Sequence, residues 1–271
     1  MDLSLIILNY KSRGLLKQCL KGLLQLHLSI TTEIIVVDNH SNDGTDEMMP
    51  AEFPALRYIR SPRNVGFAAG NNLGIREASG RYLLIMNPDI AVFGNVFEHM
   101  VEFLEKHPAV GMCGPKLLNP DGSVQTSCRM FPTVRTILYR RSPLGKLPSA
   151  REHLRKFLMR DWDHKENRPV DWILGACMLV RRSAMEKVGL MDERFFLYFE
   201  DVDWCRRFWQ CGYEVWYLGQ TAELVHYHRQ LSAESPGLSG VFSYVTRLHI
   251  RSGIQYFLKY RGHPLPQQPS A

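Results

Sequence analysis

Two apolar runs of the sequence lead directly to aspartate. Leu83–Met86 leads to Asp89, and Ile34–Val37 leads to Asp38. Ligands of α/β sheets bind at the carboxyl ends of strands, so two carboxylates at two such ends are expected to share one crevice. Carboxylate oxygens there can hold a divalent cation or accept hydrogen bonds from a nucleotide. A single aspartate in this position could be only a helix cap, but the pairing favours ligand binding.

Two histidines late in the sequence could add a metal ligand. His226 and His228 are one residue apart, and along a strand this spacing places both rings on the same face. Neutral imidazole is a common ligand of divalent metals. The alternative is a pair of buried histidines with a structural role.

Three acidic residues begin a predicted helix that runs to Trp209. Asp203 is spaced to pair with Arg207 one turn later, and acids in the first turn of a helix complement its dipole. These roles account for Asp203 and leave Asp201 available for chemistry. Crowding by Glu200 and Asp203 is expected to raise the pKa of Asp201, which suits a general base, whereas the helix N-terminus acts in the opposite direction.

The elements that would position these groups follow an α/β pattern. Apolar runs alternate with helical patterns over the first half, which predicts parallel strands joined by crossover helices in a Rossmann-like arrangement. The predicted strands are 3–8, 34–37, 56–59 and 82–86, and the predicted helices are 15–28 and 68–79. The glycine-rich start of the second helix allows its backbone to approach a ligand or the sheet closely. Neither GxGxxG nor GK[ST] occurs, which argues against NAD enzymes and P-loop proteins.

Composition limits the class of protein. The 271 residues are 45% hydrophobic, which suffices for one large α/β domain or a domain with a smaller appendage. The net charge of +6 favours anionic partners such as nucleotides, diphosphate lipids or an acidic membrane surface, and no nucleic-acid partner is expected. Six scattered cysteines without a CxxC motif are expected to be reduced thiols of a cytoplasmic protein. Neither a signal peptide nor a spanning helix is predicted.

Two segments depart from the α/β pattern. Between Arg129 and Arg160, nine basic residues are opposed by a single acid, Glu152. This basic insertion, taken as 129–169, is expected either as a solvated loop with a short helix or as a contact for lipid or diphosphate. Residues 243–261 form a predicted amphipathic helix that packs on the catalytic domain or lies on a membrane, and the tail from Pro264 is expected to be disordered.

Five blocks of sequence, in this order, resemble the inverting family-2 glycosyltransferases, and within them the rhamnosyltransferase-like members of cell-surface polysaccharide synthesis. The blocks are Leu5–Tyr10, Ile34–Gly44, Asn64–Gly74, Asn87–Asp89, and Gly175–Met178 leading to Phe199–Asp203. The resemblance covers roughly residues 2 to 232. It implies a GT-A fold, a Rossmann-like nucleotide-binding sheet with helices on both faces, as a catalytic domain over 1–232, followed by a C-terminal helical extension over 233–271.

The resemblance also implies where the nucleotide-sugar donor would bind. Asn9 and Asp38 would contact the base and ribose. The nucleotide and sugar pocket would be shaped by Asn64, Gly66, Asn71 and Asn87. Asp89 would ligate Mg²⁺ or Mn²⁺ at the donor diphosphate, and His226 or His228 would complete that site. Because asparagine stands at position 87, the first position of this DxD-like motif, the affinity for metal is expected to be modest.

On the acceptor side, the resemblance makes Asp201 the general base. Gly175 and Ala176 would form the wall between donor sugar and acceptor, with Trp172 stacking on a sugar ring and Glu200 beside the acceptor. The alternative for the Gly175 block is a purely structural role as the start of a buried strand.

The implied reaction is transfer of one sugar per encounter. The Gln-x-x-Arg-Trp block of processive members is absent, and Arg206–Trp209 does not match it. The rhamnosyltransferase branch implies dTDP-L-rhamnose as the donor and a glycan or polyprenyl-diphosphate-linked acceptor, with contact to the inner face of the cytoplasmic membrane left open. UDP-hexose transfer, sugar nucleotidyl transfer and a non-catalytic nucleotide-sugar-binding scaffold are the alternatives.

Overall fold

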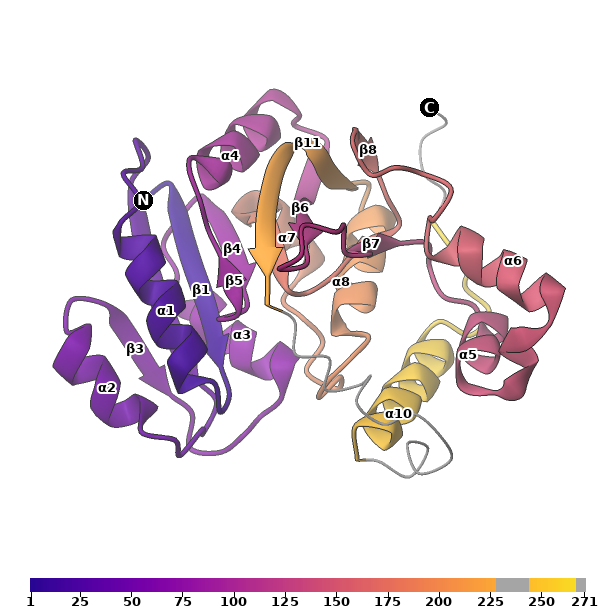
Figure 1. Cartoon of the computed structure of the whole chain (residues 1–271), viewed down its shortest axis with the longest axis horizontal. Helices are drawn as coiled ribbons and strands as arrows, with labels where there is room; N and C mark the ends of the chain where they lie inside the picture. The colour runs from indigo at the N-terminus through magenta and orange to yellow at the C-terminus, as the bar shows by residue number, and fades with distance from the viewer. Residues whose placement is uncertain (228–243, 267–271) are drawn as a thin grey trace.

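The first half of the chain forms four parallel strands in the order β3-β2-β1-β4. The computed structural model describes residues 1–227 and 244–266 (Figure 1). The strands are β1 Leu3–Asn9, β2 Thr32–Asp38, β3 Arg57–Arg60 and β4 Tyr82–Met86, and the crossover helices are α1 Arg13–Leu24, α2 Thr45–Glu52 and α3 Phe67–Glu77. Every residue of β1 and β4 is buried, as expected for central parallel strands covered on both faces. The predicted parallel strands are confirmed.

The second half of the chain extends this sheet to nine strands and makes it mixed. The order continues from β4 through β10, β6 and β11 to β5, and β8 also pairs with β11. Their bounds are β5 Ile90–Ala91, β6 Val110–Leu118, β8 Asn167–Pro169, β10 Cys177–Arg181 and β11 Glu214–His226. A separate two-stranded sheet joins β7 Cys128–Arg129 to β9 Trp172–Ile173.

Helices cover both faces of the large sheet. Alternate residues of β4 show the two faces, because Leu84 packs into one hydrophobic cluster and Leu83 into another. The first cluster includes side chains of α1, α2 and α4 Val96–Lys106, and the second includes those of α3, α7 Arg182–Val188 and α8 Glu200–Gln210. The small residues of α3 serve this packing, because a Cβ at Gly70 would lie 2.6 Å from Leu8 Cδ1.

The basic insertion folds as a compact helical unit at one end of the molecule (Figure 1). It contains α5 Val134–Arg141, a 3₁₀ turn η1 Pro143–Lys146 and α6 Pro148–Phe157. Thr133 and Thr136 form a reciprocal capping box at the start of α5, and Thr136 Oγ1 also contacts His153 Nε2 of α6 at 2.8 Å. We expected a solvated loop with one short helix. The segment instead forms two helices and a 3₁₀ turn, and the contact between α5 and α6 orders it.

The C-terminal helix is α10 Tyr244–Lys259, which confirms the predicted helix. It packs on the α8 side of the sheet, where Tyr256 is fully buried. Lys259 Nζ lies 2.7 Å from Asp192 Oδ2 and 2.5 Å from Asp203 Oδ1, and the Tyr260 hydroxyl donates to Asp203 at 2.8 Å. Packing on the rest of the protein is therefore one role of this helix.

Some predictions fall where the structure gives no description. The boundary expected at residue 232 and most of the expected disordered tail, residues 267–271, lie outside the described residues. The first residues of this tail are fixed by hydrogen bonds, because the Arg206 side chain donates to the backbone carbonyls of His263 at 3.1 Å and Pro264 at 3.0 Å. In residues 1–227 and 244–266, no helix has the length and apolar character needed to cross a bilayer. All six cysteines are free thiols, as predicted.

Candidate active site

Asp89 meets His226 where β4, β5 and β11 converge. Asp89 follows β4, and the pairing of β5 with β11 places Ile90 opposite His226. The Tyr227 N–H donates to the Asp89 carbonyl at 2.8 Å, which fixes the turn. As a result, His226 Nε2 lies 3.2 Å from Asp89 Oδ1. The structure thus brings together two of the residues that the resemblance assigns to the metal site, and their role as metal ligands stays a prediction.

A second set of contacts orients the His226 ring. Gln125 Nε2 donates to Asn119 Oδ1 at 2.8 Å and to the His226 carbonyl at 3.0 Å, so the other end of the Gln125 amide presents Oε1. His226 Nδ1 lies 2.9 Å from that oxygen and must donate to it. When the ring is neutral, Nε2 therefore presents a lone pair to Asp89. Metal-binding histidines are typically oriented in this way, by a hydrogen bond from the ring nitrogen that does not face the metal.

The Asp89 and His226 pair fits a divalent cation. Two atoms that both carry lone pairs face each other, and Asp89 Oδ1 is buried without a well-formed hydrogen bond in the described part of the chain. Adjacent ligands of an octahedral ion with bonds of about 2.1 Å lie roughly 3.0 Å apart, close to the observed separation. Within the described ranges, no group of three or more His, Cys, Asp or Glu side chains is placed so that it could hold a metal ion. His228, the third predicted ligand, lies outside them.

Asn87 is half-buried beside this pair. Its backbone N–H donates to the Ala176 carbonyl at 2.9 Å, which ties the end of β4 to the segment before β10. Ala176 is itself buried, so the bond anchors the strand end from inside the protein.

Asp38 and Asn9 lie at the ends of β2 and β1, and both side chains are buried. Asn9 Nδ2 donates to Ser41 Oγ and Thr45 Oγ1 at 3.1 Å each and lies 3.4 Å from Asp38 Oδ1. Among the described residues, Asp38 accepts long hydrogen bonds of 3.3 to 3.5 Å from the Asn9 amide, the Ser41 N–H and the Tyr58 hydroxyl. The loop after β2 is thus held against β1, and Asp38 keeps lone pairs that are weakly used.

A residue that the sequence interpretation missed as a site residue, Asn39, joins the second and third of the five sequence blocks, Ile34–Gly44 and Asn64–Gly74. Its Nδ2 donates to Asn64 Oδ1 at 3.0 Å and to the Gly66 carbonyl at 3.1 Å, and its Oδ1 accepts from the Val65 N–H at 2.9 Å. Only the turn-forming composition after Asp38 hinted at this role.

Gly66 and Asn71 have structural constraints of their own. Gly66 has φ +88°, and a Cβ there would overlap the Phe196 carbonyl, so glycine is required. Asn71 is fully buried within α3 and donates from Nδ2 to the Phe67 carbonyl at 3.0 Å. Its Oδ1 has no hydrogen-bond partner among the described residues.

Asp201 lies in the first turn of α8, directly after an unusual backbone segment. Tyr198 and Phe199 both have φ of +70°, a left-handed conformation that is costly for aromatic residues. Such strain is retained where the surrounding structure imposes it, often at functional sites. Here α10 imposes it, because Ser252 Oγ donates to the Leu197 carbonyl at 2.8 Å and His249 contacts the Phe199 ring.

The Asp201 carboxylate is held by backbone N–H groups. Oδ2 accepts from Gly175 at 3.1 Å, and Oδ1 accepts from Val202 at 2.8 Å. A side chain at Gly175 would crowd the Phe67 ring and Asp201 Cβ, so glycine allows this approach. Each carboxylate oxygen retains a second lone pair that can accept a proton.

Burial raises the pKa of Asp201, while the N–H groups of Gly175 and Val202 and the charge of Arg129 oppose that rise. Burial also raises the pKa of Glu200 well above its usual range, and Asp201 adds to this effect. The direction agrees with the prediction for Asp201, and burial, not crowding by its acidic neighbours, is the largest cause. Asp203 does not crowd Asp201, because Asp203 is bound by Arg207 at 2.9 Å and by Lys259.

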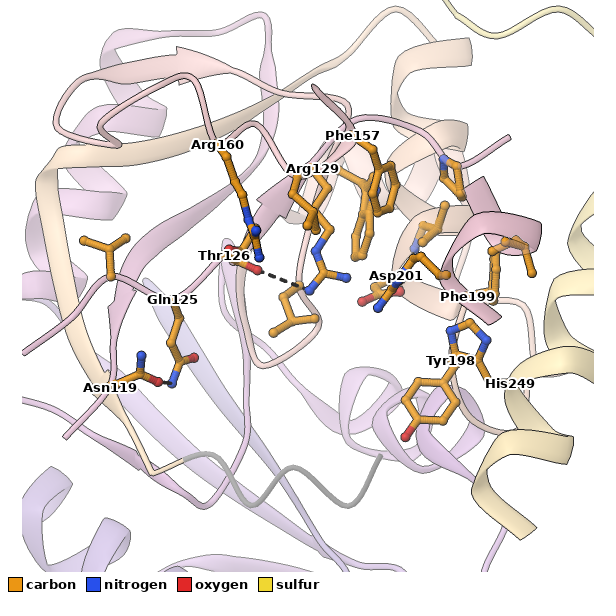
Figure 2. A pocket seen from close by; sticks show the side chains of 18 residues that line it. Asn119, Gln125, Thr126, Arg129, Phe157, Arg160, Tyr198, Phe199, Asp201 and His249 are labelled. Atoms are coloured by element: carbon orange, nitrogen blue, oxygen red, sulfur yellow. Dashed lines mark hydrogen bonds between the residues drawn. The ribbon is translucent and has the colours of Figure 1, made fainter. Parts of the chain in front are cut away.

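Asp201 borders a cavity of about 480 Å³ between α8, α10 and the basic insertion. Figure 2 shows Arg129 and Arg160 directed into it, with the Asp201 carboxylate facing the Arg129 guanidinium. Trp172 lines this cavity, and its indole N–H donates to the Met130 carbonyl at 2.8 Å. The Arg129 guanidinium lies 5.3 Å from the centre of the Trp172 ring.

The arginines are the main functional candidates that residue-by-residue interpretation of the sequence missed. The run of basic residues was visible, but nothing in the sequence told which of them would face Asp201. Asp89 borders a different, smaller cavity of about 210 Å³, together with Cys19 and Tyr227.

The chain is similar to known proteins in its sequence and in its fold. A model of the family described as glycosyl transferase family 2 matches residues 4–189. The chain is 30% identical over 225 residues to the N-acetylglucosaminyl-diphospho-decaprenol L-rhamnosyltransferase of Mycobacterium tuberculosis, which covers 77% of this chain and 72% of the relative. It is 31% identical over 214 residues to the low-salt glycan biosynthesis hexosyltransferase Agl10 of Haloferax volcanii, covering 76% of this chain and 61% of that protein.

Among solved structures, the chain resembles GalNAc-T7 with UDP, GalNAc and Mn²⁺. The TM-score is 0.60 at 18% identity, and the match covers 83% of this chain but only 44% of that one. At this identity the likeness concerns the fold alone. Together with the mixed sheet covered by helices on both faces, it confirms the predicted GT-A fold.

Proposed function

The chain belongs to glycosyltransferase family 2, and from this premise we propose that it transfers one L-rhamnosyl residue from dTDP-rhamnose to a lipid-linked glycan, with inversion at the anomeric carbon. The donor and acceptor are proposed from the mycobacterial relative, whose name specifies rhamnosyl transfer to a diphospho-decaprenol-linked sugar. Transfer from a UDP-hexose is the second candidate, because GalNAc-T7 was solved with UDP.

The observation that carries the proposal is the carboxylate of Asp201 at the wall of the large cavity. It is 7% exposed, yet its side chain borders a space large enough for an acceptor. Because burial raises its pKa, the Asp201 carboxylate binds a proton more readily than an exposed aspartate does. This combination is what a general base needs.

In the proposed reaction, Asp201 takes the proton of the acceptor hydroxyl while the N–H groups of Gly175 and Val202 hold the carboxylate in place. The acceptor oxygen forms a bond to the anomeric carbon from the face opposite the nucleotide. The bond from that carbon to the diphosphate oxygen breaks, and its electron pair leaves with the nucleotide diphosphate. One displacement therefore inverts the anomeric centre, and the proton remains on Asp201 until solvent removes it.

We assign the donor to the ends of β1, β2 and β4. Asn9 and Asp38 would contact the base and ribose, with Asn64, Gly66, Asn71 and Asn87 around the nucleotide and sugar. Asp89 and His226 would hold Mg²⁺ or Mn²⁺, which supplies positive charge at the departing diphosphate. His228 is retained as a proposed third ligand.

The acceptor side would be formed by the segment before β10 and the start of α8. Gly175 and Ala176 would separate donor sugar from acceptor, and Trp172 would present its ring to an acceptor sugar. Glu200 is buried beside Asp201, and its proposed role is a hydrogen bond to the acceptor.

We further propose that residues 1–232 are the catalytic domain, with 129–169 as its insertion, and that residues 233–271 are an extension that touches the inner membrane face. One face of α10 packs on the protein, and the other exposes Ile254 and Leu258 beside Arg247 and Arg251. Apolar side chains flanked by arginines are typical of helices that lie on anionic membranes.

Vesicle flotation tests the membrane proposal. The Ile254→Ser/Leu258→Ser double variant should float less than the wild type with phosphatidylglycerol vesicles. Leu24→Ser, which changes an exposed leucine of α1, is the matched control and should float normally. Equal flotation of the double variant and the wild type would refute the membrane contact.

The nucleotide proposal is tested by calorimetric titration with dTDP, UDP and GDP, each with and without Mn²⁺. Metal-dependent binding of dTDP supports rhamnosyl transfer and leads to an assay with dTDP-rhamnose. A preference for UDP moves the donor to UDP-hexoses. Absence of binding by all three nucleotides contradicts the proposed function.

A further inference from the structure

The large cavity beside Asp201 has more positive charge than Asp201 alone can balance. Arg129, Arg140 and Arg160 all line it, and Asp201 is the single acidic residue in its wall within the described ranges. Two other basic residues of the insertion have ion-pair partners, because Arg155 pairs with Glu152 and Asp161 and Lys156 pairs with Glu152. Neither Arg129 nor Arg160 has an ion-pair partner within 4.0 Å in the described part of the chain.

Arg129 is the most constrained of these side chains. Its Nε is buried without a hydrogen-bond partner in residues 1–227 and 244–266, and Nη2 makes one long contact of 3.4 Å with the Thr126 carbonyl. A guanidinium carries five N–H donors, and leaving them unused in a buried position is unfavourable. An anion in the cavity would satisfy them and would match the planar fork of the group.

Part of the cavity wall is apolar. Ile137, Phe157 and Leu158 line it on the side of the insertion, and the Arg140 guanidinium lies 5.8 Å from the centre of the Phe157 ring. A volume of about 480 Å³ lies within the range of small-molecule sites. The wall therefore combines a place for an anion with a place for hydrocarbon.

We propose that this cavity is an acceptor subsite in which Arg129 and Arg160 bind the acceptor's diphosphate and Phe157 and Leu158 contact the first carbons of its lipid. The donor diphosphate is assigned to Asp89, which borders another cavity, and we assign the anion bound here to the acceptor. The proximity of Arg129 to Asp201 then sets the distance between the acceptor's phosphate and the hydroxyl that loses its proton. This inference rests on the proposed function, because it identifies the acceptor of that reaction.

The test is calorimetric titration of the intact protein with three probes, with Mg²⁺ and a saturating amount of the nucleotide that it binds best. The probes are N-acetylglucosamine diphosphate carrying a decyl chain, the decyl glycoside of N-acetylglucosamine without phosphate, and inorganic pyrophosphate. The filled donor site keeps the probes out of the nucleotide pocket. The wild type should bind the diphosphate probe at least about tenfold more tightly than the glycoside.

Two variants and one control locate the effect. Arg129→Gln and Arg160→Gln should each weaken the diphosphate probe about tenfold or more and leave the glycoside unchanged. Arg160 is exposed, so its variant remains informative if Arg129→Gln fails to fold. Arg151→Gln removes the same charge from an exposed residue of α6 that does not line the cavity, and it should bind as the wild type does.

Three results would overturn the inference. These are equal affinity of the wild type for the diphosphate probe and the glycoside, unchanged binding in Arg160→Gln, or pyrophosphate binding as tightly as the diphosphate probe. The last result would mean a site for free anions. All three leave nucleotide binding intact, whereas failure of the proposed function would appear as loss of nucleotide binding by the wild type.

Discussion

The two carboxylates at the centre of the proposed reaction have opposite surroundings. Asp89 is half-buried at the edge of the sheet, and one of its oxygens faces His226 Nε2 at 3.2 Å. Asp201 is buried at the start of a helix, and both of its oxygens accept backbone hydrogen bonds. Each aspartate lies near one end of a strand or helix that the sequence already indicated. Position along the chain therefore does not distinguish the two.

The difference shows that the environment assigns the chemistry of an aspartate. Near Asp89, the imidazole Nε2 of His226 is a second atom that can ligate a cation. At Asp201, burial opposes ionisation while N–H donors and Arg129 favour it, which suits a group that must gain and lose a proton. If this comparison is right, the two residues will respond differently to substitution, metal and pH.

The largest expected effect is that of Asp201→Asn. Removing the base should lower the rate of sugar transfer by about 10²- to 10⁴-fold while nucleotide binding is retained. Initial rates of transfer and nucleotide calorimetry measure the two quantities on one preparation. Asp163→Asn, at an exposed aspartate of the insertion, is the control and should be fully active. Unchanged turnover in Asp201→Asn would refute the assignment of the base.

Asp89→Asn should act on binding. The substitution removes a charged ligand, so nucleotide affinity in Mn²⁺ should fall about 10- to 100-fold, and affinity in EDTA should stay the same. Calorimetry under both conditions separates the metal from the protein contacts. A loss of equal size in EDTA would mean that Asp89 contacts the nucleotide directly.

The pH dependence of transfer should report Asp201. The base works in its ionised form, and its pKa is raised from the ordinary 3.8, so activity should be lost as pH falls through the raised value. Below that pKa, kcat/KM should decline about tenfold per pH unit. Rates measured from pH 4 to pH 8 would show this limb, and the remaining activity of Asp201→Asn should lack it. The same limb in the variant would place the titrating group elsewhere.

The smallest effect concerns stability. Glu200 has a raised pKa in the folded protein, so its contribution to stability is full below its unfolded pKa and is lost as pH rises through the folded value. Glu200→Gln keeps the shape without the charge and should raise the free energy of unfolding by about 1–3 kcal/mol at pH 8, with the gain shrinking toward pH 4. Urea unfolding at both pH values measures this. A variant less stable than the wild type at pH 8 would contradict the account.

The donor half of this molecule could be predicted from the sequence to a large extent. Strand β4 is a continuous apolar run, and it begins and ends where it was expected, at Tyr82 and Met86. Burial on both faces leaves a strand of this kind little choice of register or position. The family resemblance placed His226 or His228 at the Asp89 site, and the structure brings His226 to Asp89, although the two are 137 positions apart in the sequence.

The acceptor half could be predicted only in outline, because distant contacts build it. Arg129 faces Asp201 because β7 pairs with β9, where Arg129 lies opposite Trp172. The backbone before Asp201 depends on α10, through Ser252 and the ring contacts of Phe199. Local pattern carries no information on pairings of this range, so the basic run could be recognised while the arginines that matter could not.

The most direct test of the contrast between Asp89 and Asp201 is a ¹³C NMR titration of protein labelled at the aspartate carboxyl carbons. Assignments would come from Asp89→Asn and Asp201→Asn. The account predicts that the Asp201 resonance titrates at a pKa above 3.8 and is unmoved by Mg²⁺, and that the Asp89 resonance shifts when Mg²⁺ and nucleotide are added. An Asp201 carboxyl that titrates at or below 3.8, or that shifts with Mg²⁺ as Asp89 does, would contradict the division of roles.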